Sequence, residues 1–286
     1  MNDYIIVTDS TADLPADIIK EADLRVMPLK FRMDDKDYND GDMPAEDFFT
    51  SLQDGAVSTT SQPTPFEFTE MFEPYVADGK GILYIAFSSG LSGTYNSACT
   101  AAKDLEEKYP DAKIKVIDSL CASAGEGLLV YLAVQKKQSG MDLDELAQWV
   151  ENKKLKICHW FTVEDLFFLK RGGRISTMTA LLGTTLAIKP VMHVDNNGKL
   201  IPVKKVRGRR QSIEALVKEM TATAVNPSEQ TVFITHGNCK DEAEYTANLI
   251  KQELHVKNVI INMLGTVIGS HSGPGTLAIF FVGTER

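Results

Sequence analysis

Two segments carry hydroxyl groups where a strand would give way to a helix. Ser92 and Gly93 lie in SSGLSGT, which follows the apolar run 81–87 and opens a helical pattern. The first amides of a helix can bind an anion, and glycine lets the backbone approach it closely. Thr60 and Ser61 lie in TTSQPTP, where they could cap the next helix or turn toward a ligand. Both segments are therefore candidate anion sites.

His271 lies in GSHSGPG, which we expect to be a loop whose small residues leave the imidazole accessible. Ser92 and His271 could be the nucleophile and base of an acyl hydrolase or acyltransferase, or two donors to one carboxylate. Thr94 stands where the GxSxG elbow requires glycine, and no third catalytic group is evident. These features favour the two-donor interpretation. A binding module for a phosphorylated or other anionic metabolite is a third alternative.

Basic residues gather in two further segments. Arg171 and Arg174 flank the double glycine of LKRGGRIS, which is also a normal helix stop signal. Arg207, Arg209 and Arg210 lie in KVRGRR, where a helix is expected to begin, although a helix N-terminus disfavours cations. We expect at least one arginine of this second cluster to contact a partner protein or a phosphate.

Composition excludes several classes of protein. The net charge of −9 argues against a general nucleic-acid binder and against a broadly basic membrane-binding face. No apolar run approaches the roughly 20 residues of a membrane-spanning helix, and no signal-peptide pattern is present. The four cysteines form no CxxC pair, which favours free thiols in a reducing cytoplasm over disulfides or a zinc site. We therefore expect a cytoplasmic protein without metal or cofactor.

Strands and helices alternate through the first half of the chain. Strands are predicted at 4–8, 81–87, 114–118 and 156–162, with helices from about residue 15, over 94–109 and ending near 138. GEG at 125–127 is expected inside that last helix. Such βαβ units predict a parallel sheet covered on both faces, with ligands beyond the carboxyl ends of its strands. The loops DSTADLP, SSGLSG and DSLCAS all leave such ends.

The second half has a different pattern. Alternating runs on either side of Asn197-Gly198 predict a hairpin over 191–206. Helices are expected over 209–224 and 241–254, with strands at TVFITHG, VIINM and TLAIFFV. The fold class is therefore α/β with two domains. We expect residues 1–162 to form an N-terminal α/β/α domain with a parallel sheet, and residues 163–286 to form a smaller α+β domain with a mixed sheet.

Seven stretches together resemble the DegV family, whose members include the fatty-acid-binding subunits of bacterial fatty acid kinase. They are VTDSTADLP, TTSQPTP, SSGLSGTYNSA, LKRGGRIS, IKPV, KVRGRR and GTVIGSHSGPGTLAIFF, in the family's order, so that residues 3–283 resemble one family unit. The resemblance implies a long-chain fatty acid whose tail is buried between the domains. Thr60, Ser92 and His271 match the residues that hold its carboxylate.

The resemblance also implies that the protein is a lipid carrier with no catalytic residues of its own. A separate ATP-dependent kinase subunit would phosphorylate the bound acid, and the acyl-phosphate would feed phospholipid synthesis. Ser61 and Gly93 are expected beside the carboxylate, and Arg171, Arg207 and Arg209 at the partner or the phosphate. Transient membrane contact is expected. The apolar runs FTVEDLFFL and LLGTTLAI are candidate walls for the tail.

Overall fold

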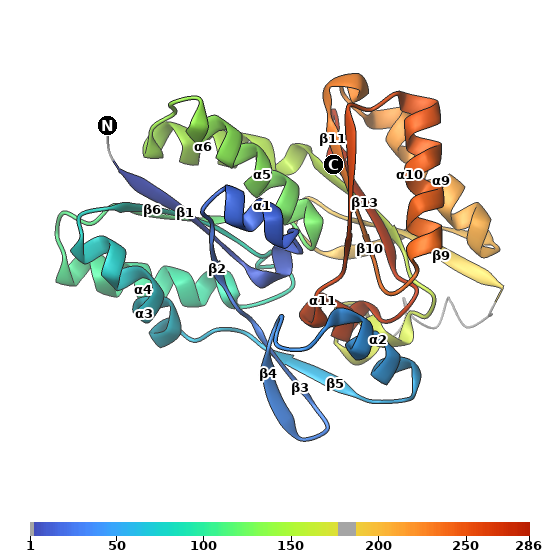
Figure 1. The fold of residues 1–286 in the computed structure, drawn as a ribbon, viewed down its shortest axis with the longest axis horizontal. Coiled ribbons are helices and arrows are strands. Elements are labelled where there is room, and N and C mark those ends of the chain that lie inside the picture. The colour runs from blue at the N-terminus through green and yellow to red at the C-terminus, as the bar shows by residue number, and fades with distance from the viewer. Residues whose placement is uncertain (1–2, 177–186) are drawn as a thin grey trace.

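The computed structural model describes residues 3–176 and 187–286, and its first sheet is parallel as expected (Figure 1). The strand order is β2-β1-β6-β7, with β1 Tyr4–Asp9, β2 Arg25–Met27, β6 Gly81–Ala86 and β7 Ile114–Asp118. All six residues of β1 and of β6 are buried, as their unbroken apolar sequences predict. Their carboxyl ends point toward the middle of the molecule.

Helices cover both faces of this sheet. Helices α3 (Pro65–Ala77) and α4 (Thr94–Lys108) pack on one face around Phe68, Phe72 and Tyr84. Helices α1 (Ala16–Glu21), α5 (Ala124–Gln138) and α6 (Leu143–Lys153) pack on the other. The GEG segment lies inside α5 as expected, and added Cβ atoms at Gly125 and Gly127 would lie 2.1 Å from His159 and 2.4 Å from the carbonyl of Ala12. These glycines therefore let α5 pack closely on both sides.

The second sheet is mixed, as expected, with the order β10-β9-β8-β13-β11-β12. Its strands are β8 Ile157–Thr162, β9 Ile188–Val194, β10 Leu200–Arg207, β11 Thr231–His236, β12 Asn258–Met263 and β13 Leu277–Val282. Among the described strands of this second sheet, only β11 and β12 pair in parallel. Helices α9 (Arg209–Thr223) and α10 (Lys240–Leu254) cover the outer face, and α5 packs on the inner face. Helix α5 thus lies between the two sheets.

The predicted strand 156–162 was assigned to the wrong sheet. Strand β8 pairs antiparallel with β13 and β9 in the second sheet, and the first sheet ends at β7. The run ICHWFT has the buried, apolar character of either sheet, so its sequence does not distinguish between them. The hairpin β9–β10 is confirmed, with Gly198 at φ 69° in its turn.

A small third sheet, β4-β3-β5, had no counterpart in the sequence analysis. It contains β3 Lys30–Met33, β4 Lys36–Asn39 and β5 Ser58–Ser61, and α2 (Ala45–Gln53) packs against it through Phe31, Phe48 and Phe49. The turn between β3 and β4 has positive φ at Asp34 and Asp35, 50° and 60°. That is the primed turn geometry of a tight hairpin, here without the glycine that usually signals it.

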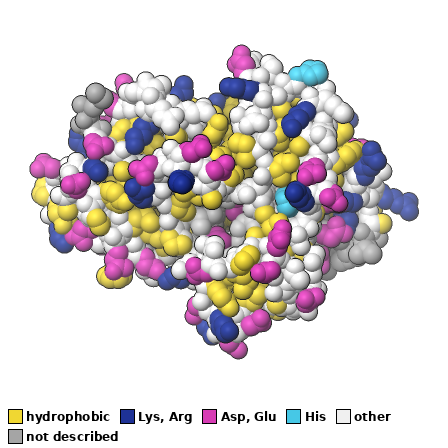
Figure 2. Space-filling view, in the orientation of Figure 1, with side chains coloured by type: hydrophobic (Ala, Val, Ile, Leu, Met, Phe, Trp, Pro, Cys, Tyr) yellow, Lys and Arg dark blue, Asp and Glu magenta, His cyan; other side chains and the backbone are white. Residues whose placement is uncertain are grey.

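The remaining elements are short. Helices α7 (Phe167–Arg171) and α11 (Thr266–Ser272) lie against one another below the second sheet, and 3-10 turns occur at Ser10–Ala12, Lys154–Lys156 and Pro227–Glu229. Acidic and basic side chains are interspersed over the face drawn in Figure 2. Within the described ranges, no helix has the length and apolar character needed to cross a membrane.

Candidate functional site

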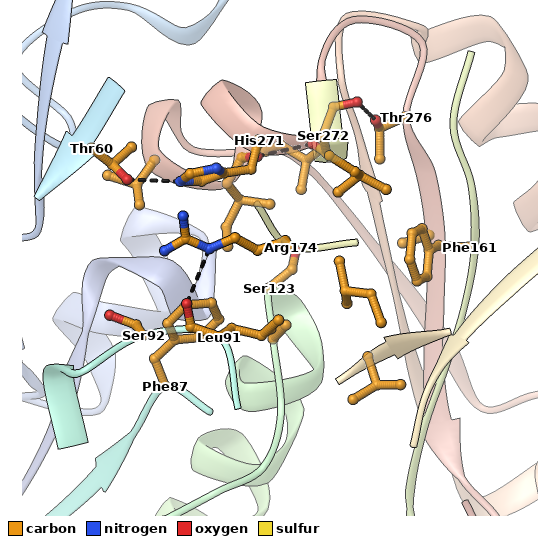
Figure 3. Close-up of a pocket in the computed structure, with 18 of the residues that line it drawn as sticks. Thr60, Phe87, Leu91, Ser92, Ser123, Phe161, Arg174, His271, Ser272 and Thr276 are labelled. Carbon is orange, nitrogen blue, oxygen red and sulfur yellow. Dashed lines mark hydrogen bonds between the residues drawn. The ribbon is translucent and has the colours of Figure 1, made fainter. Parts of the chain in front are cut away.

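A cavity of about 180 Å³ lies between the carboxyl ends of the first sheet and the inner face of the second (Figure 3). Strand β5, helix α7 and helix α11 complete its walls. Two of the three hydroxyl-rich loops reach it, those after β6 and β7, as the topology predicts for a parallel sheet. Its apolar lining residues are Leu29, Phe87, Leu91, Ala122, Phe161, Leu169, Val194, Leu200, Leu264, Val267, Ile268, Ala278 and Phe280.

The predicted wall FTVEDLFFL contributes Phe161 and Leu169 to this lining. In the other predicted wall, LLGTTLAI, residues 181–186 lie outside the described residues. Two polar side chains of the lining, those of Ser272 and Thr276, already use their hydroxyl hydrogens within the protein. Ser272 Oγ donates to the carbonyl of Ile268 (3.0 Å), and Thr276 Oγ1 donates to that of Ser272 (2.9 Å). Much of the cavity is therefore apolar in character.

His159 is another polar lining residue whose hydrogen bonds are internal. Its Nδ1 lies 3.0 Å from the carbonyl of Ile157, and its Nε2 lies 3.3 Å from the amide of Ala122. A carbonyl only accepts and an amide only donates, so Nδ1 carries the hydrogen and the ring is neutral. Burial lowers the pKa of His159 well below its usual value, which agrees with this assignment.

His271 and Thr60 meet at one end of the cavity, with 2.7 Å between Nε2 and Oγ1. The expectation that His271 lies in a loop was wrong, and one of the two alternatives left open for Thr60, capping of the next helix, is excluded. His271 lies in the last turn of helix α11 and not in a loop, and Thr60 lies in strand β5 and caps no helix. The cap of α3 is Thr64, which exchanges hydrogen bonds with Glu67. Thr60 is consequently available to the cavity.

The imidazole of His271 is buried against glycine. A Cβ at Gly172 would lie only 2.1 Å from its Nδ1, so the first glycine of LKRGGRIS makes room for the ring. Nδ1 is buried and has no hydrogen-bond partner among the described residues. Burial, with lesser contributions from Arg174 and Arg171, lowers the pKa of His271 to about 4. The ring is therefore neutral at pH 7.

Arg174 is a cavity residue that the sequence analysis did not select as a site residue. Its guanidinium lies between the Thr60–His271 pair and Ser92 (Figure 3). Nε donates to the carbonyl of Leu91 (3.1 Å) and Nη1 donates to that of Gly172 (2.5 Å). Burial lowers the pKa of Arg174, yet an arginine remains charged at neutral pH. The cavity thus has a cation at its polar end.

Ser92 also lines this end, and its hydroxyl contacts Thr94 and not His271. Its Oγ lies 2.8 Å from Oγ1 of Thr94, and no hydrogen bond joins the described side chains of Ser92 and His271. Ser61 lines the cavity at an exposed position, and Gly93 is the N-cap residue of α4. A Cβ at Gly93 would lie 2.3 Å from Gln62 Oε1. Gly93 therefore brings α4 close to the strand that carries Thr60.

The three arginines expected at a partner or phosphate have different surroundings. Arg171 packs on the ring of Phe168 at 4.9 Å, and its buried Nη2 has no partner among the described residues. Arg207 is exposed at the end of β10. Arg209 forms an ion pair with Glu242 (Nη2–Oε2 2.6 Å) and donates to the carbonyl of Gly275 (2.6 Å). Of the three, Arg207 has the most accessible side chain.

Buried carboxyl groups lie in the segment DSTADLP and in α5. Glu126 Oε1 is 2.8 Å from Thr8 Oγ1, which is also 3.1 Å from the carbonyl of Ile85. A threonine has one hydroxyl hydrogen, so both contacts are hydrogen bonds only if Glu126 is protonated. Burial and the nearby Asp9 raise the pKa of Glu126 well above its usual value. The described residues contain no group of three or more His, Cys, Asp or Glu placed to hold a metal.

Comparisons with known proteins point to one family. The family model described as "Uncharacterised protein, DegV family" matches residues 4–284. A DegV domain-containing protein of Clostridium perfringens is 46% identical over 100% of this chain and 99% of its own length. Two crystal structures are similar. A DegV family protein from Thermus thermophilus, described as fatty-acid binding, has a TM-score of 0.89 at 30% identity and covers 98% of this chain and 99% of its own.

The second structure is a DegV lipid-binding protein from Thermotoga maritima. Its TM-score is 0.87 at 30% identity, and the alignment covers 99% of both chains.

Proposed function

The chain belongs to the DegV family, and we propose that it binds one long-chain fatty acid, with the acyl tail in the apolar cavity and the carboxylate beside Thr60, Ser92 and His271. The observation that carries this proposal is the division of the cavity into a large apolar wall and one polar end that holds Arg174. An anion with a long apolar tail matches both parts. The solved relatives described as binding fatty acids support the same ligand class.

The apolar wall would supply most of the affinity. Each methylene removed from water contributes about 0.8 kcal/mol. A tail of about 16 carbons therefore gains roughly 13 kcal/mol before the cost of ordering it. A few donors then suffice to fix the carboxylate and to set the direction in which the acid lies.

The polar end would hold the carboxylate through Thr60, Ser92 and Arg174. Because His271 is neutral, its Nε2–H can donate to Thr60 Oγ1 at 2.7 Å, which directs the hydroxyl hydrogen of Thr60 into the cavity. Ser92 and Thr94 share one hydrogen bond, so one of their two hydroxyl hydrogens also remains to be donated. The charge of Arg174 opposes that of the carboxylate. Ser61 and Gly93 would complete the surroundings.

The carrier would act with a separate kinase subunit in the cytoplasm. A carboxylate oxygen would attack the γ-phosphorus of ATP held by that subunit, so that ADP leaves and an acyl-phosphate forms for phospholipid synthesis. Arg171, Arg207 and Arg209 are the residues proposed to meet the partner or the phosphate, with the accessible Arg207 the first to test. Loading and release would involve transient contact with a membrane.

Native mass spectrometry of the purified protein, followed by lipid extraction, tests the ligand. We expect a mass increment equal to one long-chain fatty acid, and the same acid in the extract. A protein that carries no fatty acid, and that takes up none when incubated with palmitate, would contradict the proposal. Labelling of Ser92 by a serine-directed phosphonate would instead support an acyl hydrolase.

A further inference from the structure

Helix α11, which carries His271, cannot cap its own N-terminus. The helix has only seven residues, and its N-cap residue is Gly265, which has no side chain. The first amides of any helix lack partners within the helix and need acceptors from elsewhere. A helix this short also depends on outside contacts for its stability. The position of His271 therefore depends on whichever groups supply those acceptors.

Two carboxylates from distant parts of the chain supply them. Asp40 Oδ1 accepts hydrogen bonds from the amide of Thr266 (2.8 Å) and from its Oγ1 (2.7 Å). Asp13 Oδ1 accepts from the amide of Gly265 (2.9 Å). A Cβ at Gly265 would lie 2.8 Å from Asp13 Oδ1 and 3.0 Å from Asp40 Oδ1. The glycine thus allows both carboxylates to reach the same helix end.

The other end of α11 is attached to strand β5. Ser270 Oγ lies 2.7 Å from Ser58 Oγ, and His271 Nε2 lies 2.7 Å from Thr60 Oγ1. Ser58 and Thr60 are two residues apart, so they face the same side of the strand. Strand β5 belongs to the small sheet β4-β3-β5, and Asp40 follows the last residue of β4 directly. One small sheet therefore holds both ends of α11.

From these contacts we infer that Asp40 is a positioning residue for the fatty-acid site: its carboxylate fixes helix α11 so that the imidazole of His271 meets Thr60. Asp40 does not line the cavity, so it would act only through the helix. Burial raises the pKa of Asp40, and the hydrogen bonds that counteract this come from Thr266 and Val267 at the start of helix α11 and from the side chain of Ser10. The inference rests on the proposed function for its claim that this is a fatty-acid site, but the contacts between Asp40, helix α11 and His271 do not depend on that function.

The test compares Asp40→Ala with Asp40→Asn, which keeps an acceptor oxygen. The control is Asp34→Asn, an exposed carboxyl in the β3–β4 turn whose positive φ suits asparagine. The first readout is the ¹⁵N resonances of the His271 imidazole in lipid-free protein, which report the hydrogen bond at Nε2. The second is the Kd for palmitate from calorimetry.

We expect Asp40→Ala to shift the Nε2 resonance and to raise the Kd about tenfold, equivalent to about 1.4 kcal/mol. Asp40→Asn should stay within about threefold of the wild type, and Asp34→Asn should match it. Unchanged His271 resonances in Asp40→Ala would overturn the inference. If that variant does not fold, Thr266→Val decides, because it removes only the hydroxyl contact and should give a smaller shift in the same direction; no shift would overturn the inference.

The two proposals fail separately. If the wild-type protein does not bind palmitate or any other fatty acid, the proposed function is wrong, while the His271 resonances still decide whether Asp40 positions the ring.

Discussion

Gly172→Ala tests the placement of His271 with the smallest possible change. The added Cβ would lie 2.1 Å from Nδ1 and 3.0 Å from Cε1 of the imidazole. Packed interiors leave no space for such an overlap, so the ring or the backbone must move by about 1 Å. Gly172 has φ −72°, which alanine adopts without strain, and the effect is therefore purely steric.

A shift of this size would break the hydrogen bond to Thr60. The distance from Nε2 to Oγ1 is 2.7 Å, and a further 1 Å takes it beyond hydrogen-bonding range. Thr60 then loses the partner that orients its hydroxyl toward the carboxylate. A hydrogen bond to a charged group contributes about 1.5–3 kcal/mol. We therefore expect the Kd for palmitate to rise between about tenfold and a hundredfold.

Isothermal titration calorimetry at pH 7 measures this change, and Gly173→Ala is the matched control. Gly173 has φ 71° and nothing within 4 Å of an added Cβ, so alanine strains the backbone there without touching the ring. Both variants should melt earlier than the wild type, but only Gly172→Ala should bind palmitate more weakly. Wild-type affinity in Gly172→Ala would refute the role assigned to the imidazole.

Three other outcomes are expected. Thr60→Ala combined with Ser92→Ala should weaken palmitate binding by about 1.5–3 kcal/mol for each lost donor without loss of the fold. The control variant Thr59→Ala, on the opposite face of β5, should bind normally. If the double variant binds palmitate as tightly as the wild type, Thr60 and Ser92 do not belong to the site. Glu126→Gln should gain stability relative to the wild type by up to about 1.4 kcal/mol per pH unit above about pH 4.5. The sign follows because a raised pKa of Glu126 stabilises the fold at low pH, and this contribution is lost as the pH rises through the pKa of the folded state. Urea unfolding at several pH values measures the free energy of unfolding of both proteins. A difference between them that does not change with pH would mean that Glu126 is ionised in the folded protein. Arg207→Ala should slow acyl-phosphate formation by an added fatty acid kinase subunit while palmitate binding is unchanged. Lys251→Ala is the control and should leave both unchanged. If Arg207→Ala also weakens palmitate binding, Arg207 belongs to the lipid site.

Local signals in the sequence predicted the regular framework. The buried apolar runs of β1 and β6 and the helical patterns between strands indicated a parallel sheet, because such strands are covered on both faces. The turn at Asn197-Gly198 predicted the β9–β10 hairpin, since glycine readily adopts the positive φ found there. Motif order along the chain also pointed to the family, and with it to Thr60, Ser92 and His271.

The sequence by itself thus determined the type of most elements, and it supplied the residues proposed to bind an anion. Only the tertiary structure assigned β8 to the second sheet, formed α11 around His271 and brought Arg174 and Asp40 to their places. The physical reason is how far apart along the chain the residues lie that specify each feature. A turn or an amphipathic helix is specified by neighbouring residues, whereas strand pairing and a seven-residue helix are stabilised by residues far away in the chain. Asp40 and Thr266 show this directly, because their hydrogen bond joins positions 226 residues apart.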